Sequence, residues 1–120
     1  MKYSFILFAI LALNCTTSQN SGLYEKYNPD EFLYWSEDRN LKWSDFQGSP
    51  SSSNQNLPSE IFIYNPSTIE KSNLLSKPAL TSLIVFDKKK SWCKKENMTE
   101  QYLLYNQVIF DIYQLYRQKL

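Results

Sequence analysis

The sequence predicts an α+β domain in which a small antiparallel or mixed sheet packs on one long C-terminal helix. Two segments have the apolar, β-branched composition of strands, residues 60–64 (EIFIY) and residues 79–86 (ALTSLIVF). Residues 97–120 instead repeat apolar side chains with the spacing of a helix. Strands followed by a single long helix are typical of the α+β class.

The N-terminal residues 1–14 are organised like a signal peptide. Lys2 precedes an uninterrupted apolar run, residues 5–13 (FILFAILAL), which is about half as long as a membrane-spanning helix. Cys15 follows this run and Asn14, as in a bacterial lipoprotein signal. We therefore predict that Cys15 becomes a lipidated N-terminus. The alternative is a secreted protein in which Cys15 is incidental and free to pair with Cys93.

The composition allows one small domain and argues against nucleic acid as a partner. Removing residues 1–14 leaves 12 Lys and Arg against 12 Asp and Glu, because one of the 13 basic residues is Lys2. A nucleic-acid-binding surface needs an excess of basic residues to displace counterions. Nothing in the sequence specifies an oligomeric state.

Residues 15–30 lack a helical or strand period and predict a tether, so the folded domain is expected to be residues 31–120. Aromatic residues between positions 32 and 46 predict short packed segments around a turn at 37–40. Residues 48–59 are rich in Ser, Asn and Pro and predict a loop.

The predicted C-terminal helix begins with a capping box formed by Asn97 and Glu100. Its apolar side chains form a wide stripe, so we expect the helix to be deeply embedded in the core. The members of the stripe are Leu104, Tyr105, Val108, Ile109, Ile112, Tyr113, Leu115 and Tyr116.

The chain has no histidine, which removes His-based zinc sites and the common ways of activating a Ser or Cys nucleophile. Lys94 and Lys95 beside Cys93 favour a lowered thiol pKa, but no histidine can accept its proton, so a structural role for Cys93 is expected. The acids Asp38, Asp45 and Asp111 match no carboxylate-pair motif. We expect no enzyme activity and no cofactor.

Five lysines surround Trp92 in residues 88–95 (KKKSWCKK). They are Lys88, Lys89, Lys90, Lys94 and Lys95. Such a cluster can contact anionic lipid headgroups, with each lysine contributing about 1 kcal/mol. A solvated turn is the favoured interpretation, and a membrane-surface patch is the alternative.

Three short blocks, in this order, resemble one protein family. They are residues 38–48 (DRNLKWSDFQG) followed by Pro50, residues 86–92 (FDKKKSW), and residues 110–112 (FDI) with the Leu-Tyr and Lys-Leu pairs that follow. Together they resemble the bacterial secreted family of unknown function described as predicted zinc-dependent proteases. In that family the last block belongs to a helix that carries an H-E-x-x-H motif.

The resemblance implies a zincin-like remnant without its metal site. Two histidines at positions i and i+4 would share one helix face and hold zinc, and the glutamate would activate water. Alignment on residues 110–112 places Tyr105 and Ile109 at the histidines and Asn106 at the glutamate, and it keeps Gln107. Ile109 has no lone pair and Asn106 cannot take a proton, so the resemblance implies loss of catalysis and of the metal.

The expected function is therefore that of a non-catalytic envelope lipoprotein, an inactive and truncated relative of a secreted metallopeptidase. Its expected partners are the membrane, through the lipid on Cys15, and a peptide or protein. The bacterial cell envelope is the expected location, with a periplasmic or secreted protein as the alternative. A truncated gene product without a selected function and a membrane-surface module that uses the lysines are the competing hypotheses.

Overall fold

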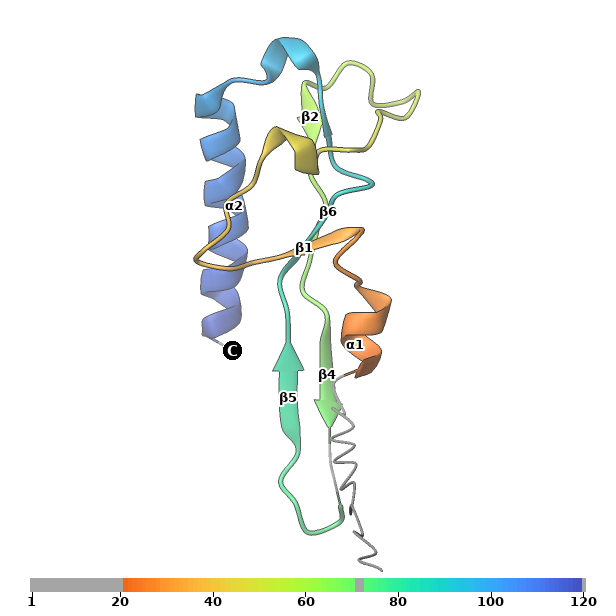
Figure 1. The fold of residues 1–120 in the computed structure, drawn as a ribbon, viewed down its shortest axis with the longest axis vertical. Coiled ribbons are helices and arrows are strands. Elements are labelled where there is room, and N and C mark those ends of the chain that lie inside the picture. The colour runs from red at the N-terminus through yellow and green to blue at the C-terminus, as the bar shows by residue number, and fades with distance from the viewer. Residues whose placement is uncertain (1–20, 71–72, 120) are drawn as a thin grey trace, which may run out of the picture.

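The computed structural model describes residues 21–70 and 73–119, and the predicted signal peptide and Cys15 lie outside them. The α+β class is confirmed, because small antiparallel sheets accompany one long C-terminal helix (Figure 1). The helices are α1 (Ser21–Lys26), the 3₁₀ turns η1 (Trp43–Asp45) and η2 (Lys95–Asn97), and α2 (Glu100–Gln118). The strands are β1 (Phe32–Tyr34), β2 (Ser59–Glu60), β3 (Ile63–Tyr64), β4 (Ser67–Glu70), β5 (Ala79–Ser82), β6 (Val85–Asp87) and β7 (Trp92–Cys93).

The central sheet has the strand order β1-β6-β3, and both of its strand pairs are antiparallel. Phe86 in the middle of β6 lies opposite Leu33 of β1 on one side and Ile63 of β3 on the other. Two further antiparallel pairs, β2–β7 and β4–β5, complete the strand pairing of the described residues.

Each of the two predicted strands is divided in the structure, because the chain changes its pairing partner. Residues 59–64 pair first with β7 and then with β6. Between the two paired parts, the Phe62 amide donates to Ser91 Oγ over 3.0 Å. Residues 79–87 likewise pair first with β4 and then with β1 and β3. An apolar run alone does not reveal such a change of partner.

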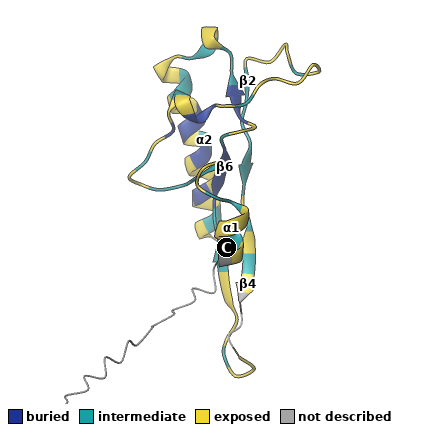
Figure 2. Cartoon of the chain, turned by 45° about the vertical axis from the view of Figure 1, so that its right-hand side comes forward, coloured by how far each residue is buried: buried dark blue, intermediate teal, exposed yellow. Residues whose placement is uncertain are grey.

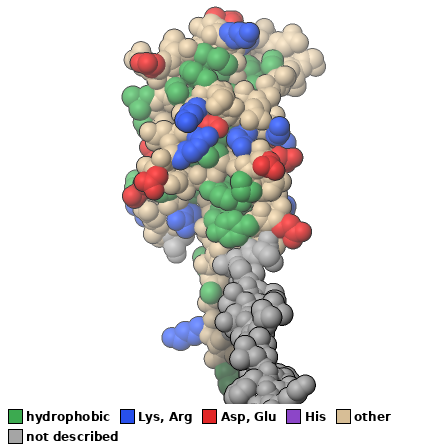
Figure 3. Space-filling view, viewed as in Figure 1, with side chains coloured by type: hydrophobic (Ala, Val, Ile, Leu, Met, Phe, Trp, Pro, Cys, Tyr) green, Lys and Arg blue, Asp and Glu red, His purple; other side chains and the backbone are tan. Residues whose placement is uncertain are grey.

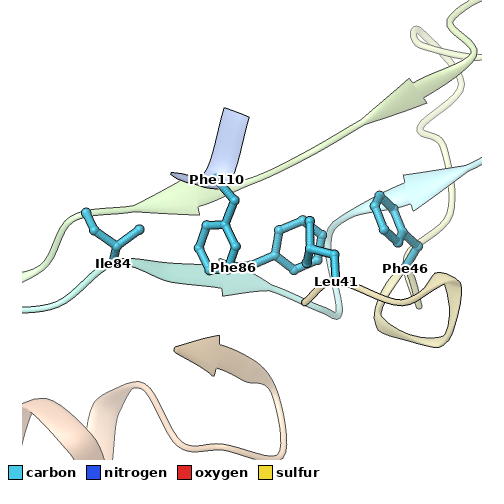
Figure 4. Close-up of a cluster of buried hydrophobic side chains, with 5 residues drawn as sticks. All are labelled: Leu41, Phe46, Ile84, Phe86 and Phe110. Carbon is cyan, nitrogen blue, oxygen red and sulfur yellow. The ribbon is translucent and has the colours of Figure 1, made fainter. Parts of the chain in front are cut away.

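The core lies between β6, the inner side of α2 and the segment that contains η1. Its buried members, shown in Figure 4, are Leu41, Phe46, Ile84, Phe86 and Phe110. The Phe86 ring lies 5.2 Å from the Phe46 ring and 6.0 Å from the Phe110 ring, centroid to centroid. Phe110 therefore fixes α2 to the central strand.

The prediction that the apolar stripe of α2 is embedded is wrong. The side chains that are buried are Asn106, Gln107, Phe110 and Gln114, whereas most of the stripe is exposed. Figure 2 shows the buried residues of α2 along the side of the helix that faces the strands. Each buried amide has a hydrogen-bonding partner, as buried polar groups require. Gln107 bonds to the Leu41 amide, whereas Asn106 and Gln114 bond to groups of α2 itself.

The start of α2 also differs from the prediction. Thr99, not Asn97, is the N-cap, and its Oγ1 accepts a hydrogen bond from the amide of Tyr102 over 3.2 Å. Asn97 is the last residue of η2. The short 3₁₀ turn takes up residues 95–97, so the cap moves two residues along the chain.

Residues 21–26 form α1, so the expectation that the whole of residues 15–30 lacks regular structure is wrong for this part. Tyr24 packs edge-on against Tyr34 of β1, with a centroid distance of 5.5 Å, and the Tyr34 hydroxyl donates to the Tyr27 carbonyl. Aromatic contacts with β1 thus stabilise a helix that is too short to form alone. In the turn that follows, Asn28 Oδ1 accepts from the Asp30 and Glu31 amides.

The β4–β5 hairpin projects beyond the rest of the described fold (Figure 1). Its register pairs Ile69 with Leu80, and both of these side chains are exposed. Leu74 and Leu75 lie in the connection between the two strands and are almost completely exposed.

Candidate functional site

Of the three positions that the resemblance assigns to a lost zinc motif, Tyr105 and Ile109 lie four residues apart on one side of α2, whereas Asn106 is turned toward the core. Tyr105 is exposed and stacks on Tyr102 at a centroid distance of 5.9 Å and an interplanar angle of 6°. Ile109 is half-buried. Asn106 points inward, is 2% exposed, and its Nδ2 donates to the Tyr102 carbonyl over 2.8 Å.

Tyr105 borders an open cavity of about 430 Å³ at the start of α2. The cavity is lined by Glu96, Asn97, Thr99, Gln101, Tyr102 and Tyr105. The Tyr102 hydroxyl is engaged with Ser59 Oγ at 2.6 Å. Within residues 21–70 and 73–119, no three Cys, Asp or Glu side chains are grouped so that they could hold a metal ion.

Gln107, which the resemblance aligns inside the H-E-x-x-H motif, is buried and uses both ends of its side-chain amide in hydrogen bonds. Its Oε1 accepts from the Leu41 amide over 2.7 Å, and its Nε2 donates to Asp111 Oδ1 over 2.8 Å. The same Asp111 oxygen accepts from Trp35 Nε1 over 2.8 Å. Gln107 and Asp111 therefore join the helix to the chain on both sides of the 37–40 turn.

The first and second sequence blocks also contact each other. Arg39 forms a two-pronged ion pair with Asp45, at 2.7 Å and 3.1 Å, and Asp45 also accepts from the Lys42 amide over 2.8 Å. The Gly48 amide donates to the Ser91 carbonyl over 2.8 Å. The blocks that are separate in sequence are thus neighbours in the structure.

The predicted candidate acids are not brought together. Asp45 is buried in its ion pair with Arg39, Asp111 is bound to Trp35 and Gln107, and Asp38 lies exposed in the turn. Each is thus held in a different local arrangement.

Burial raises the pKa of the Cys93 thiol, and the nearby negative charge of Glu96 raises it further. The lowering that Lys94 and Lys95 favoured in the sequence is therefore not observed. The Cys93 Sγ donates to the Lys94 carbonyl over 3.4 Å, as expected of a protonated, half-buried thiol.

The five lysines of the proposed membrane patch fall into two groups at the two ends of β7. Lys88, Lys89 and Lys90 form the turn that leaves β6, whereas Lys94 and Lys95 lead from β7 into η2. Lys88 Nζ donates to the Pro29 carbonyl over 2.8 Å, and Lys90 Nζ lies 6.0 Å from the centre of the Tyr64 ring. A joint membrane contact of these lysines stays a prediction.

The surface that sequence reasoning missed is the outer side of α2, which we call the outward face. It consists of Leu104, Tyr105, Val108, Ile112, Tyr113, Leu115 and Tyr116, all between 43% and 67% exposed. The sequence indicates this face through the spacing of Gln107, Phe110 and Gln114. These three residues lie together on the opposite side of the helix. Hydrophobic side chains also reach the surface in several patches of the view in Figure 3.

Comparison with protein-family models, with curated proteins and with solved structures found no match to this chain. The resemblance of the three blocks to the family of predicted zinc-dependent proteases thus stays a prediction. None of the helices in the described part of the chain is long and apolar enough to cross a membrane.

Proposed function

We propose that this chain is a non-catalytic lipoprotein of the bacterial cell envelope that binds a protein through the outward face of α2. Lipidation of Cys15 would hold it at a membrane and leave the folded part free to bind. The observation that carries the proposal is the orientation of α2, with its amides toward the core and its apolar side chains toward solvent.

An outward face of this kind differs from scattered surface leucines. Single exposed apolar side chains are common on soluble proteins, but a continuous apolar stripe along a helix marks an interaction surface. The charged side chains in the middle and last turn of α2 do not interrupt the stripe. Asp111 bonds to Trp35 and Gln107, and Arg117 bonds to Gln114 and to the Ser82 carbonyl.

The non-catalytic part of the proposal rests on the chemistry of three side chains. Ile109 offers no ligand atom, the Asn106 amide is buried and bonded to the Tyr102 carbonyl, and the exposed Tyr105 ring is stacked on Tyr102. Isothermal titration calorimetry with Zn²⁺ tests this part. We expect no stoichiometric binding, and stoichiometric binding at micromolar concentration would overturn it.

The binding part is tested by cysteine labelling in cells that make the full chain. We expect a Val108→Cys variant to react with maleimide several times more slowly in cells than as dilute purified protein, because a bound protein covers the site. A Lys89→Cys variant, exposed but remote from the outward face, serves as the control and should react equally in both settings. Peptide mass spectrometry separates these sites from Cys15 and Cys93.

Equal labelling of Val108→Cys in the cell and in dilute solution would overturn the binding part. The calorimetric result would be unaffected, so the two parts of the proposal can fail independently.

A further inference from the structure

Four side chains of the outward face have the spacing found in the seam of a two-stranded coiled coil. Tyr105, Val108, Ile112 and Leu115 follow one another at intervals of three, four and three residues, which is the a/d spacing of a heptad repeat. All four are exposed, by 44% to 59%. Such a seam fits a second α-helix better than it fits an extended peptide, because a helix supplies side chains at the same intervals.

The outward face has the length and area that a pair of identical chains requires. Helix α2 has 19 residues, so it is about 28 Å long. With about 100 Å² accessible on each of the seven outward side chains, one chain offers roughly 700 Å² of apolar surface. Covering all seven side chains on both chains would bury roughly 1,400 Å² in total, which lies within the range of stable protein interfaces.

The charges at the ends of α2 favour an antiparallel pair. Glu100 lies in the first turn, whereas Arg117 lies in the last turn and Lys119 caps the helix. Antiparallel packing brings Glu100 to the level of Lys119 of the second copy and also opposes the two helix dipoles. Parallel packing would instead place like charges beside each other at both ends. The preceding turn η2 carries one residue of each sign, Lys95 and Glu96, and favours neither arrangement.

We propose that the partner of the outward face is a second copy of this chain, bound through an antiparallel α2–α2 contact around a two-fold axis that passes the outer side of the helix at the level of residue 110. In this arrangement Tyr105 faces Leu115 of the second copy, and Val108 faces Ile112 of the second copy. Opposed residues then have the same spacing on both helices, as a self-complementary interface requires. The inference rests on the proposed use of the outward face in protein binding.

Disulfide cross-linking of the full chain in cells tests both the identity of the partner and the antiparallel orientation of the two α2 helices. Two differently tagged chains are produced together, one with Tyr105→Cys and one with Leu115→Cys. Under mild oxidation we expect a disulfide that joins the two differently tagged chains. Its yield should exceed that of chains with only Cys15 and Cys93. Chains with Tyr105→Cys alone should cross-link poorly, because the two added cysteines would be about 15 Å apart along the helix axis.

Stronger cross-linking of Tyr105→Cys to itself than to Leu115→Cys would overturn the antiparallel arrangement. No cross-linking above the background would overturn the second copy as the partner. Continued protection of Val108→Cys from maleimide would then show that another protein or the bilayer covers the face, whereas loss of protection would also refute the proposed function.

Sedimentation of the purified full chain in mild detergent provides an independent measurement. We expect a monomer–dimer equilibrium whose dissociation constant rises by about tenfold or more in Val108→Arg, because the substitution buries a charge without a partner. Leu75→Arg is the matched control, since Leu75 is 98% exposed in the hairpin connection, and its dissociation constant should not change. An equal response of the two variants, or a wild-type chain that is monomeric throughout, would overturn the proposal.

Discussion

The side-chain amide of Gln107 connects α2 to the segment that precedes η1. It is 8% exposed, and it uses its oxygen for the Leu41 amide and its nitrogen for Asp111. Replacement of the oxygen by an apolar group would leave the Leu41 amide without its acceptor. A buried, unsatisfied polar group usually costs about 1–3 kcal/mol.

We therefore expect Gln107→Leu to lower the free energy of unfolding by about 1–3 kcal/mol. Gln118→Leu makes the same chemical change at an exposed position of the same helix and should stay within about 0.5 kcal/mol of wild type. Urea unfolding followed by tryptophan fluorescence measures both variants. Equal stabilities of the two variants would show that the Gln107 hydrogen bonds do not hold α2.

The Cys93 thiol gives the structure a testable pH dependence. Burial, with the charge of Glu96, raises the thiol pKa on folding, so the thiolate is rarer in the folded than in the unfolded chain. We expect iodoacetamide to alkylate Cys93 more slowly in the folded protein than in urea at pH 8, as measured by peptide mass spectrometry. The stability that this group contributes is fully present below its unfolded pKa and is lost as the pH rises through the folded value.

An equal or faster reaction of the folded Cys93 would mean that Lys94 and Lys95 outweigh burial at this thiol. Unfolding measured between pH 7 and pH 10 provides the second check. A rise in stability over this range that disappears in Cys93→Ser would contradict the raised pKa.

At the scale of the elements, the position and type of α2 could be predicted from the sequence, but the side that it buries could not. Apolar periodicity identifies a helix because the residues on one side share their environment. It does not tell whether that environment is the core of the same chain or something outside it. The buried side of α2 is set by hydrogen bonds to Leu41 and Trp35, which are about 70 residues away in sequence.

The strands, too, could be predicted from the sequence only in part. Residues 60–64 and 79–86 were recognised as extended from their composition, but each is divided between two pairing partners. The decisive interaction at Phe62 is made by Ser91, a small polar residue in a different block of sequence. The composition of a segment indicates that it is extended, but it does not identify the strand with which the segment pairs.

The loop after η1 and the turn after β6 approach each other so closely at Gly48 that only glycine fits. A Cβ atom at this position would lie 2.5 Å from the Lys90 carbonyl oxygen and 2.7 Å from its carbon. Both are backbone atoms of a turn held by Asp87, whose Oδ1 accepts from the Lys89 and Lys90 amides. The turn cannot yield without loss of these bonds.

We expect Gly48→Ala to destabilise the protein by about 1–3 kcal/mol, as overpacking of a fixed contact does. Gly22→Ala is the matched control, because nothing lies within 4 Å of a Cβ there and the residue belongs to α1. Alanine is the better helix former, so the control should be neutral or more stable by up to about 1 kcal/mol. Thermal unfolding with circular dichroism compares the two, and a neutral Gly48→Ala would contradict the close approach.

In the whole molecule, the three sequence blocks of the family resemblance meet around one core. Phe46, Phe86 and Phe110 come from one block each and are in ring contact. The recognisable residues of the blocks are therefore the ones that build the fold.

The same architecture predicts very uneven stability across the molecule. Strand β6 is paired on both edges and covered by α2 through Phe110, so its amides should open only when the whole domain unfolds. The β4–β5 hairpin pairs only with itself in the described sheets, and a two-stranded hairpin alone is marginally stable in water. The Arg117 guanidinium of α2 attaches it to the helix by donating to the Ser82 carbonyl, whereas the bond from the Leu83 amide to the Pro66 carbonyl continues the hairpin's own ladder at its base.

We therefore expect amide hydrogen exchange in residues 67–82 to be faster than in β6 by a factor of about 100 or more, since local opening of the hairpin leaves the core intact. Mass spectrometry of peptides from the two regions measures this difference on the full chain. Arg117→Gln removes one attachment and should speed exchange in the hairpin while exchange in β6 stays unchanged. Equal protection of both regions would show instead that the hairpin unfolds together with the core, or that a bound partner covers its free edges.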